Sequence, residues 1–224
     1  WAQKTGKRRE DRQHITTMLS ALLLLAAVPP ALAEQCFTAP SPSRSIPIPA
    51  HLSSQPISST FTFESTLPGH TPPGYLVYLG ANVYELPSTG PPSILQYEVF
   101  AAEAGRYEVA MYTARSERGG GPLRDDEGND VWLRMGYEED WVKLYTDFGD
   151  AMEEWRWTTA FDLEEEEEKV APVVEMHAGW NRLFVAGRSF GYYIDRVVLT
   201  PEGVERDFLV YEPELVDCGP WIES

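Results

Sequence analysis

Apolar and polar residues alternate in short runs along much of the chain. In such a run every second side chain falls on the same face of an extended backbone, so each run predicts a half-buried antiparallel strand. The clearest sets are Phe61 and Phe63; Leu95, Tyr97 and Val99; Tyr107, Val109 and Met111; and Val131, Leu133 and Met135.

Other runs are rich in aromatic and β-branched residues, which favour strands. They cover Tyr75–Leu79, Trp141–Thr146, Trp155–Phe161, Val170–Met176, Arg182–Ala186 and Tyr192–Leu199. Turn sequences such as "RGGGPLRDDEGND" separate the runs, and none has the period of an amphipathic helix. About ten strands without helices predict an all-β fold, an antiparallel β-sandwich forming a single domain over residues 61–200.

The first residues predict export. Residues 1–17 are polar and basic and read as a leader without structure of its own. An uncharged apolar stretch, Leu19–Val28, follows Met18 and ends in Pro-Pro and Ala-Leu-Ala. This pattern is typical of a secretory signal peptide and is too short to span a membrane. We predict a signal peptide at 18–33, cleavage after Ala33, and a soluble secreted protein.

The chain has two cysteines, Cys36 and Cys218. In an oxidising compartment the simplest arrangement is one disulfide, which would bring the Pro- and Ser-rich extended segment 34–60 beside the C-terminal tail 201–224. Closing so long a loop would stabilise the fold by about 4 to 5 kcal/mol through the entropy of the unfolded chain. Two unpaired thiols are the alternative.

The charge is strongly negative, with a formal net charge of −17. Without residues 1–33, which hold five Lys or Arg and two Asp or Glu, it is near −20. Nucleic acid and anionic membranes are therefore unfavourable partners, because both attract basic patches. The run Glu164–Glu168 predicts a solvated loop or edge.

The pentapeptide Gly187–Gly191 matches the G-x-S-x-G of serine hydrolases. That motif presents a nucleophile only where a strand enters the turn and a helix leaves it. Here the aromatic and β-branched run Tyr192–Leu199 follows, which predicts a strand, so we do not expect Ser189 to be a nucleophile. Metalloprotease, Cys–His and phosphate-loop motifs are absent from the sequence. A pair of carboxylates for glycoside hydrolysis is not excluded.

Four segments resemble, in this order, the jelly-roll carbohydrate-binding modules, which are non-catalytic galactose-binding-like and malectin-like β-sandwiches. They read "AGRYEVAMYTARS", "NDVWLRM", "WVKLY" leading into "WRWTTAF", and "GWNRLFVAGRSFGYYIDRVVL", and the resemblance covers about residues 75–200. It implies a jelly-roll sandwich and places "GRSFG" in the turn before the closing strand.

A sugar ring offers an apolar face and a rim of hydroxyls, so its receptor needs exposed aromatic rings and planar polar groups. The candidates are the aromatic residues Trp141, Tyr192 and Tyr193 with the polar residues Arg115 and Asn129 near the loop edge that such modules use. Trp132, Trp155 and Trp157 alternate with polar residues and are expected to pack against a sheet face. At Tyr193 the related modules commonly carry Asn, a departure that bears on this loop-edge site.

The related modules also hold a structural calcium ion between their first and last strands. The resemblance assigns it to Glu64 and Asp195, whose carboxylates suit calcium. Thr62 and Thr66 stand where the related modules have a second glutamate. The alternative is that Asp195 pairs with Arg188 or Arg196.

The leading hypothesis is a secreted, non-catalytic module that binds a glycan or polysaccharide, as a monomer or as part of a larger chain. A structural or adhesive jelly-roll domain without a sugar site is the alternative, and a glycoside hydrolase ranks third.

Overall fold

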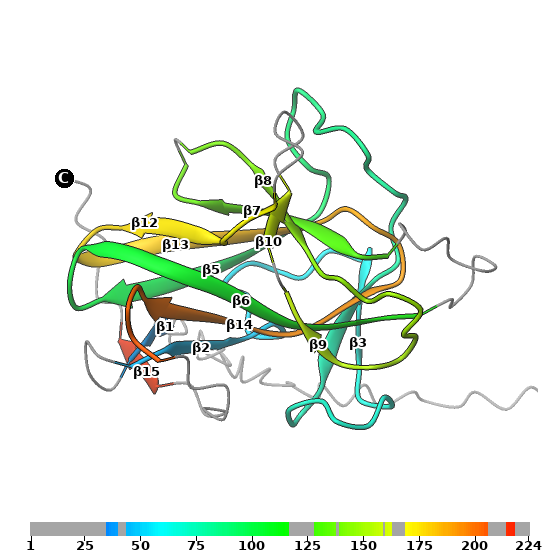
Figure 1. The fold of residues 1–224 in the computed structure, drawn as a ribbon, viewed down its shortest axis with the longest axis horizontal. Helices are drawn as coiled ribbons and strands as arrows, with labels where there is room; N and C mark the ends of the chain where they lie inside the picture. The colour runs from blue at the N-terminus through cyan, green and yellow to red at the C-terminus, as the bar shows by residue number, and fades with distance from the viewer. Residues whose placement is uncertain are drawn as a thin grey trace, which may run out of the picture. The chain divides into compact units, whose positions relative to one another are not determined.

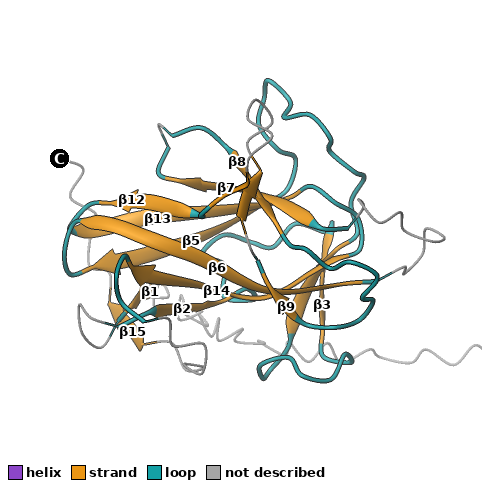
Figure 2. Cartoon of the chain, in the orientation of Figure 1, coloured by secondary structure: helices purple, strands orange, loops and turns teal. Residues whose placement is uncertain are grey.

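The computed structural model describes residues 35–39, 44–116, 128–137, 139–158, 160–162, 169–205 and 214–217. These residues belong to one compact unit, Leu32–Ser224. They form strands and loops without a helix (Figure 2). The strands are β1 (Gln35–Thr38), β2 (Ile46–Pro49), β3 (Phe61–Glu64), β4 (Tyr75–Tyr78), β5 (Ile94–Ala101), β6 (Gly105–Arg115), β7 (Asp130–Met135), β8 (Val142–Tyr145), β9 (Arg156–Trp157), β10 (Ala160–Asp162), β11 (Lys169–Val170), β12 (Val173–Met176), β13 (Gly179–Gly187), β14 (Tyr192–Pro201) and β15 (Glu214–Asp217).

The strands make two sheets (Figure 1). An eight-stranded sheet has the order β11-β10-β8-β7-β13-β5-β1-β15, and a seven-stranded sheet has the order β12-β6-β14-β4-β3 with β2 on β14 and β9 on β6. Among these pairs β1 and β5 run parallel and the others antiparallel. The consecutive strands β4 to β7, and again β12 to β14, alternate between the sheets, so their connections pass over the ends of the sandwich, as in a jelly roll. The predicted all-β, antiparallel jelly-roll β-sandwich is confirmed.

The core lies between the sheets and follows the predicted alternation. The inward sets of β5, β6 and β7 are buried, and they pack with Leu183, Val185, Ile194 and Val197 of the two central strands. Phe63 departs from the pattern. It lies on β3, the strand at the end of its sheet, where Phe61 is buried but 49% of Phe63 is exposed and its ring contacts His51.

The segment 34–60 takes part in the sandwich rather than only linking to it. Ile46 and Ile48 of β2 are buried in the core, and β2 pairs along β14 from Leu199 to Arg196. Pro47 and Pro49 lack the N–H that a second neighbour would need, which suits a strand that pairs on one side. The domain boundary predicted at residue 61 is therefore too late.

The two ends of the described chain meet. β1 pairs antiparallel with β15, with Cys36 opposite Val216, at the lower left of Figure 1. Cys218 lies outside the described residues, as do the leader 1–17, the signal peptide 18–33 with its cleavage after Ala33, and the run Glu164–Glu168. No helix of the described part of the chain is long and apolar enough to cross a membrane.

The pairing of β1 with β15 supports the Cys36–Cys218 disulfide, which remains a prediction. Cys36 is buried in β1, and Cys218 follows the last residue of β15 in the sequence. Mass spectrometry of non-reduced peptides should find the two cysteines in one linked pair. Two alkylatable thiols in protein folded under oxidising conditions would contradict it.

Stability should fall at alkaline pH because of Tyr97. This side chain is fully buried, its hydroxyl donates to the carbonyl of Ala50 at 2.7 Å, and burial raises its pKa. Above about pH 10 the unfolded chain releases a proton that the folded chain keeps, so stability declines by about 1.4 kcal/mol per pH unit for this group.

Urea unfolding from pH 8 to 11 measures that slope. Tyr97→Phe should unfold more easily at neutral pH, by about 1 kcal/mol for the lost hydrogen bond, but should show a shallower alkaline decline. Tyr84→Phe, at an exposed position, is the matched control. An unchanged slope in Tyr97→Phe would contradict this account.

Candidate functional site

The register of the eight-stranded sheet places one row of polar and aromatic side chains on its outer face. Trp132 of β7 is opposite Lys143 of β8, which is opposite Asp162 of β10. The adjacent row, Val131, Leu144 and Phe161, lies in the core. Because side chains alternate along a strand, Trp132, Lys143 and Asp162 face away from the core together.

The same outer face extends over β7 and β13, where it carries arginine and aromatic side chains. Arg134 is opposite Phe184, and its guanidinium carbon lies 4.7 Å from the Phe184 ring centre and 4.6 Å from that of Trp141. The Trp141 and Phe184 ring centres are 6.3 Å apart. Contacts of a cation with two ring faces hold the indole of Trp141 in place.

Trp141 borders a hollow of about 290 Å³ on this face, which we call the Trp141 hollow. Its lining residues are Glu85, Leu86, Trp132, Trp141, Val142, Lys143 and Asp162. Lys143 and Asp162 form an ion pair at 2.8 Å. The indole N–H of Trp132 is buried and has no acceptor among the described residues. The hollow thus combines two indoles with a charged donor and a charged acceptor.

Three aromatic residues were predicted to stack on a sugar. Of these, Trp141 is partly open to solvent, whereas Tyr192 and Tyr193 are both buried. Tyr192 points into the core, where its hydroxyl lies 2.9 Å from that of Thr146 and burial raises its pKa. Tyr193 points to the outer face of the seven-stranded sheet and stacks on Tyr75, with ring centres 5.2 Å apart. The prediction that both are exposed is wrong.

The segment between β3 and β4 explains the burial of Tyr193. Leu67 and Trp155 pack on the cluster formed by Tyr75 and Tyr193, and the Trp155 indole donates to the carbonyl of Pro68 at 2.9 Å. This cover consists of residues far from Tyr193 in the sequence, so the local pattern gives no sign of it.

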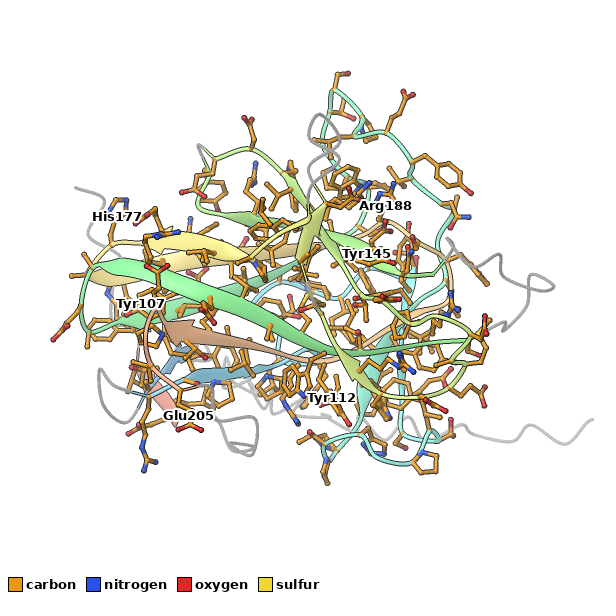
Figure 3. All side chains as sticks on the ribbon, viewed as in Figure 1. Tyr107, Tyr112, Tyr145, His177, Arg188 and Glu205 are labelled. Atoms are coloured by element: carbon orange, nitrogen blue, oxygen red, sulfur yellow. The ribbon has the colours of Figure 1, made fainter. Side chains whose placement is uncertain are left out.

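Trp132, Trp155 and Trp157 pack against the sheets as predicted. Trp132 is only 6% exposed. Trp155 stacks on Tyr112 with ring centres 5.3 Å apart, and Trp157 lies 4.9 Å from the same ring. Arg196 lies over Tyr112 and Trp157. This cluster, around Tyr112 in Figure 3, belongs to the sheet opposite the Trp141 hollow.

Arg115 and Asn129, which were predicted to supply polar groups to a ligand near the loop edge, are both buried. The Nε of Arg115 donates to the carbonyl of Ala151 at 3.0 Å, and its guanidinium also bonds the carbonyl of Gly149. The Asn129 carbonyl accepts from the backbone N–H of Thr146 at 2.8 Å. Arg115 therefore holds the loop after β8. Residues 117–127, between Arg115 and Asn129 in the chain, lie outside the described part.

Ser189 lies in the turn between two antiparallel strands, as predicted. β13 enters the turn, β14 leaves it, and Ser189 is 5% exposed. Its hydroxyl donates to Asp130 at 2.5 Å, and Arg188 bonds both oxygens of the same carboxylate. The serine thus helps to fix the turn to the start of β7.

Glu64 and Asp195 do not form the expected calcium pair. β4 lies between β3 and β14, so the two strands are not neighbours. The Asp195 carboxylate accepts from the Thr71 N–H at 2.6 Å, the Thr71 hydroxyl at 2.8 Å and Arg196 at 3.1 Å. These donors and the adjacent guanidinium leave no place for a cation, so the residues do not fit calcium. Among the described residues no group of three or more His, Cys, Asp and Glu could hold a metal.

Burial raises the pKa of Asp195, while the bonds from Thr71 and the charge of Arg196 act in the opposite direction. Replacing Asp195 by Asn would remove the buried carboxylate that pairs with Arg196 and accepts from Thr71, while Arg196 would keep its contacts with the Thr71 hydroxyl and the Tyr112 and Trp157 rings. We therefore expect Asp195→Asn to destabilise the fold by about 3 to 5 kcal/mol in urea unfolding, and Asp150→Asn, at an exposed position, to have little effect.

On this geometry a chelator should leave the melting temperature unchanged. A melting temperature that falls with chelator and recovers with added calcium would restore the calcium prediction, at ligands other than this pair.

The similarities of this chain to known proteins are distant. No protein-family model matches the sequence, and the curated proteins give no match. Among solved structures, the chain is similar to the C-terminal CBM6 of LamC, a marine laminarinase from Zobellia galactanivorans, with 15% identity over 70% of this chain and 99% of that one and a TM-score of 0.46. A family 35 carbohydrate-binding module from Clostridium thermocellum has 12% identity, coverage of 69% and 96%, and a TM-score of 0.44.

A further similarity is to the Podospora anserina GH26-CBM35 β-(1,4)-mannanase, with 14% identity over 74% of this chain and a TM-score of 0.49. This chain spans only 29% of the mannanase.

Proposed function

We propose that this protein binds a glycan without cleaving it, and that the Trp141 hollow on the outer face of the eight-stranded sheet is the binding site. The observation that carries this proposal is the partly exposed indole of Trp141 beside the Lys143–Asp162 ion pair, on a hollow of about 290 Å³. The predicted export through residues 18–33 would place the protein where extracellular polysaccharides occur.

The geometry supports a sugar because it pairs a flat apolar surface with polar groups at its border. The C–H face of a sugar ring can stack on the Trp141 indole, while hydroxyls can exchange hydrogen bonds with Lys143 and Asp162. Arg134, over the same indole, holds it before the ligand arrives. Less conformational freedom is then lost on binding.

The size and openness of the hollow indicate modest affinity. Its volume is near the lower end of the range for ligand pockets, which suits one or two rings of a longer chain. Stacking on one indole and a few hydroxyl bonds must offset desolvation and lost freedom, so we expect a Kd on the order of 10 μM to 1 mM.

The charges in the hollow support binding rather than hydrolysis. Glycoside cleavage needs two carboxylates, one of them able to act as an acid. Of the two carboxylates that line the hollow, Glu85 and Asp162, Asp162 is already engaged in an ion pair with Lys143 at 2.8 Å.

Trp141→Ala should abolish retention on an affinity gel of the bound polysaccharide and lower the melting temperature by only a few degrees, because the indole is partly exposed. Trp141→Phe should retain weak binding, since a smaller ring remains. Trp157→Ala, which removes a partly buried indole from the opposite sheet, is the matched control and should keep wild-type retention.

Wild-type retention by a folded Trp141→Ala variant would contradict the proposed site. If a broad glycan array shows no binding to the wild-type protein at millimolar concentration, the structural or adhesive hypothesis becomes the better account.

A further inference from the structure

A larger hollow, of about 440 Å³, lies where β7 and β12 end and β13 begins. We call it the Glu139 hollow. The lining residues used here are Tyr137, Glu139, Glu175, His177, Trp180 and Arg182. His177 and Arg188, just outside the two ends of β13, are far apart in Figure 3. The Glu139 hollow therefore lies at the end of the strands opposite the Ser189 turn.

Two aromatic residues line this hollow. Tyr137 is 57% exposed, and Trp180 is partly buried with its ring 4.8 Å from that of Phe100. Arg182 donates to the Tyr137 hydroxyl at 2.8 Å and lies 5.0 Å from its ring centre. Tyr137 is thus held at the border with most of its ring in solvent.

The positive charge of Arg182 is already balanced inside the sheet. Its Nε lies 3.1 and 3.2 Å from the two carboxylate oxygens of Glu98, a residue only 3% exposed. Gln96 donates to the same carboxylate at 2.7 Å. Arg182 therefore offers little net charge to neutralise other acids of the hollow.

Two further carboxylates line the hollow, and nearby bases balance their negative charge less fully. Glu139 forms no ion pair with any residue that the structure describes. Glu175 lies 3.7 Å from Arg106, and more than half of each side chain is exposed, so this pair contributes little. Partial burial raises the pKa of Glu139, the charge of Glu175 adds to that effect, and His177 acts against it. The hollow is therefore suited to a cation.

We propose that the Glu139 hollow binds the ammonium-bearing ring of a glucosamine oligomer, with the charged nitrogen at Glu139 and Glu175 and the ring against Tyr137 and Trp180. An ammonium gains from carboxylates and from aromatic faces together. Two aromatic residues and a volume of about 440 Å³ suit a sugar ring better than the thin stem of a lysine side chain. The Glu139 and Trp141 hollows have no lining residue in common, although Arg134 lies over the rings of both Tyr137 and Trp141.

Calorimetric titration of the whole protein with a glucosamine tetramer and with its fully N-acetylated counterpart tests the proposal. The two ligands share the sugar backbone but only the first carries ammonium groups, so the first should bind at least ten-fold more tightly. Glu139→Gln and Glu175→Gln should each weaken glucosamine binding about ten-fold, and Tyr137→Ala should weaken it as well.

Two controls separate this site from general attraction to an acidic protein and from the site proposed above. Glu154→Gln makes the same charge change at an exposed position outside the hollow and should keep wild-type affinity. Trp141→Ala should keep the preference for the glucosamine tetramer over its N-acetylated counterpart, whatever its effect on the binding of polysaccharides in general.

Equal affinity for the two tetramers, or equal weakening by all three Glu→Gln changes, would overturn the proposal. Tighter binding of a lysine tetrapeptide than of the glucosamine tetramer would overturn it too, in favour of a basic peptide. The substituted acids are surface residues, so melting curves verify that each variant is folded.

Discussion

The register of β13 between β5 and β7 decides which side chains can meet a ligand. Leu183 is opposite Tyr97 on one side and Met135 on the other, and all three lie in the core. One residue further, Phe184 and Arg134 face outward beside Trp141. A slip of β13 by a single residue would turn Arg182 and Phe184 toward the core and Leu183 and Val185 toward solvent. The burial of the inner face of the eight-stranded sheet therefore determines which side chains its outer face presents.

Charge on this outer face is arranged in local pairs. Lys143 is held by Asp162, Arg182 by Glu98, and Arg188 by Asp130 at the turn. Arg134 instead lies over aromatic rings. Such groups are ordered before a ligand binds, and they present the flat apolar surfaces and fixed polar atoms that a sugar requires. The Glu139 hollow differs because its acidic groups exceed the bases near them.

Much of the fold could be predicted from the sequence because a strand needs only a local alternation. The inward sets of β5, β6 and β7 and the turn at Ser189 were evident from that pattern alone. The strand β2 was not evident from the sequence. Its two prolines are unusual in a strand that pairs on both sides, and the sequence does not show that β2 pairs on one side only. The position of Phe63 at a sheet end likewise depends on strand order.

The site was less predictable because it depends on contacts between distant segments. Trp141 is partly exposed as predicted, but Tyr193 is covered by Leu67 and Trp155, and Arg115 bonds to a loop more than thirty residues away. Glu64 and Asp195 were expected on neighbouring strands, and β4 lies between them. The sequence did not predict Lys143, Asp162 and Arg134 as neighbours of Trp141 in the proposed site, although each alternates with core residues in its strand. That alternation shows which residues face outward, but not which of them come together.

The most direct test of the central claim is a two-dimensional ¹H–¹⁵N spectrum recorded while a glycan fragment is titrated into the protein, with the tryptophan indole signals assigned. If the fragment binds at the Trp141 hollow, the indole signals of Trp141 and Trp132 move progressively while those of Trp155 and Trp157 on the opposite sheet stay in place. Movement confined to Trp155 and Trp157, with Trp141 unchanged at saturation, would contradict the account.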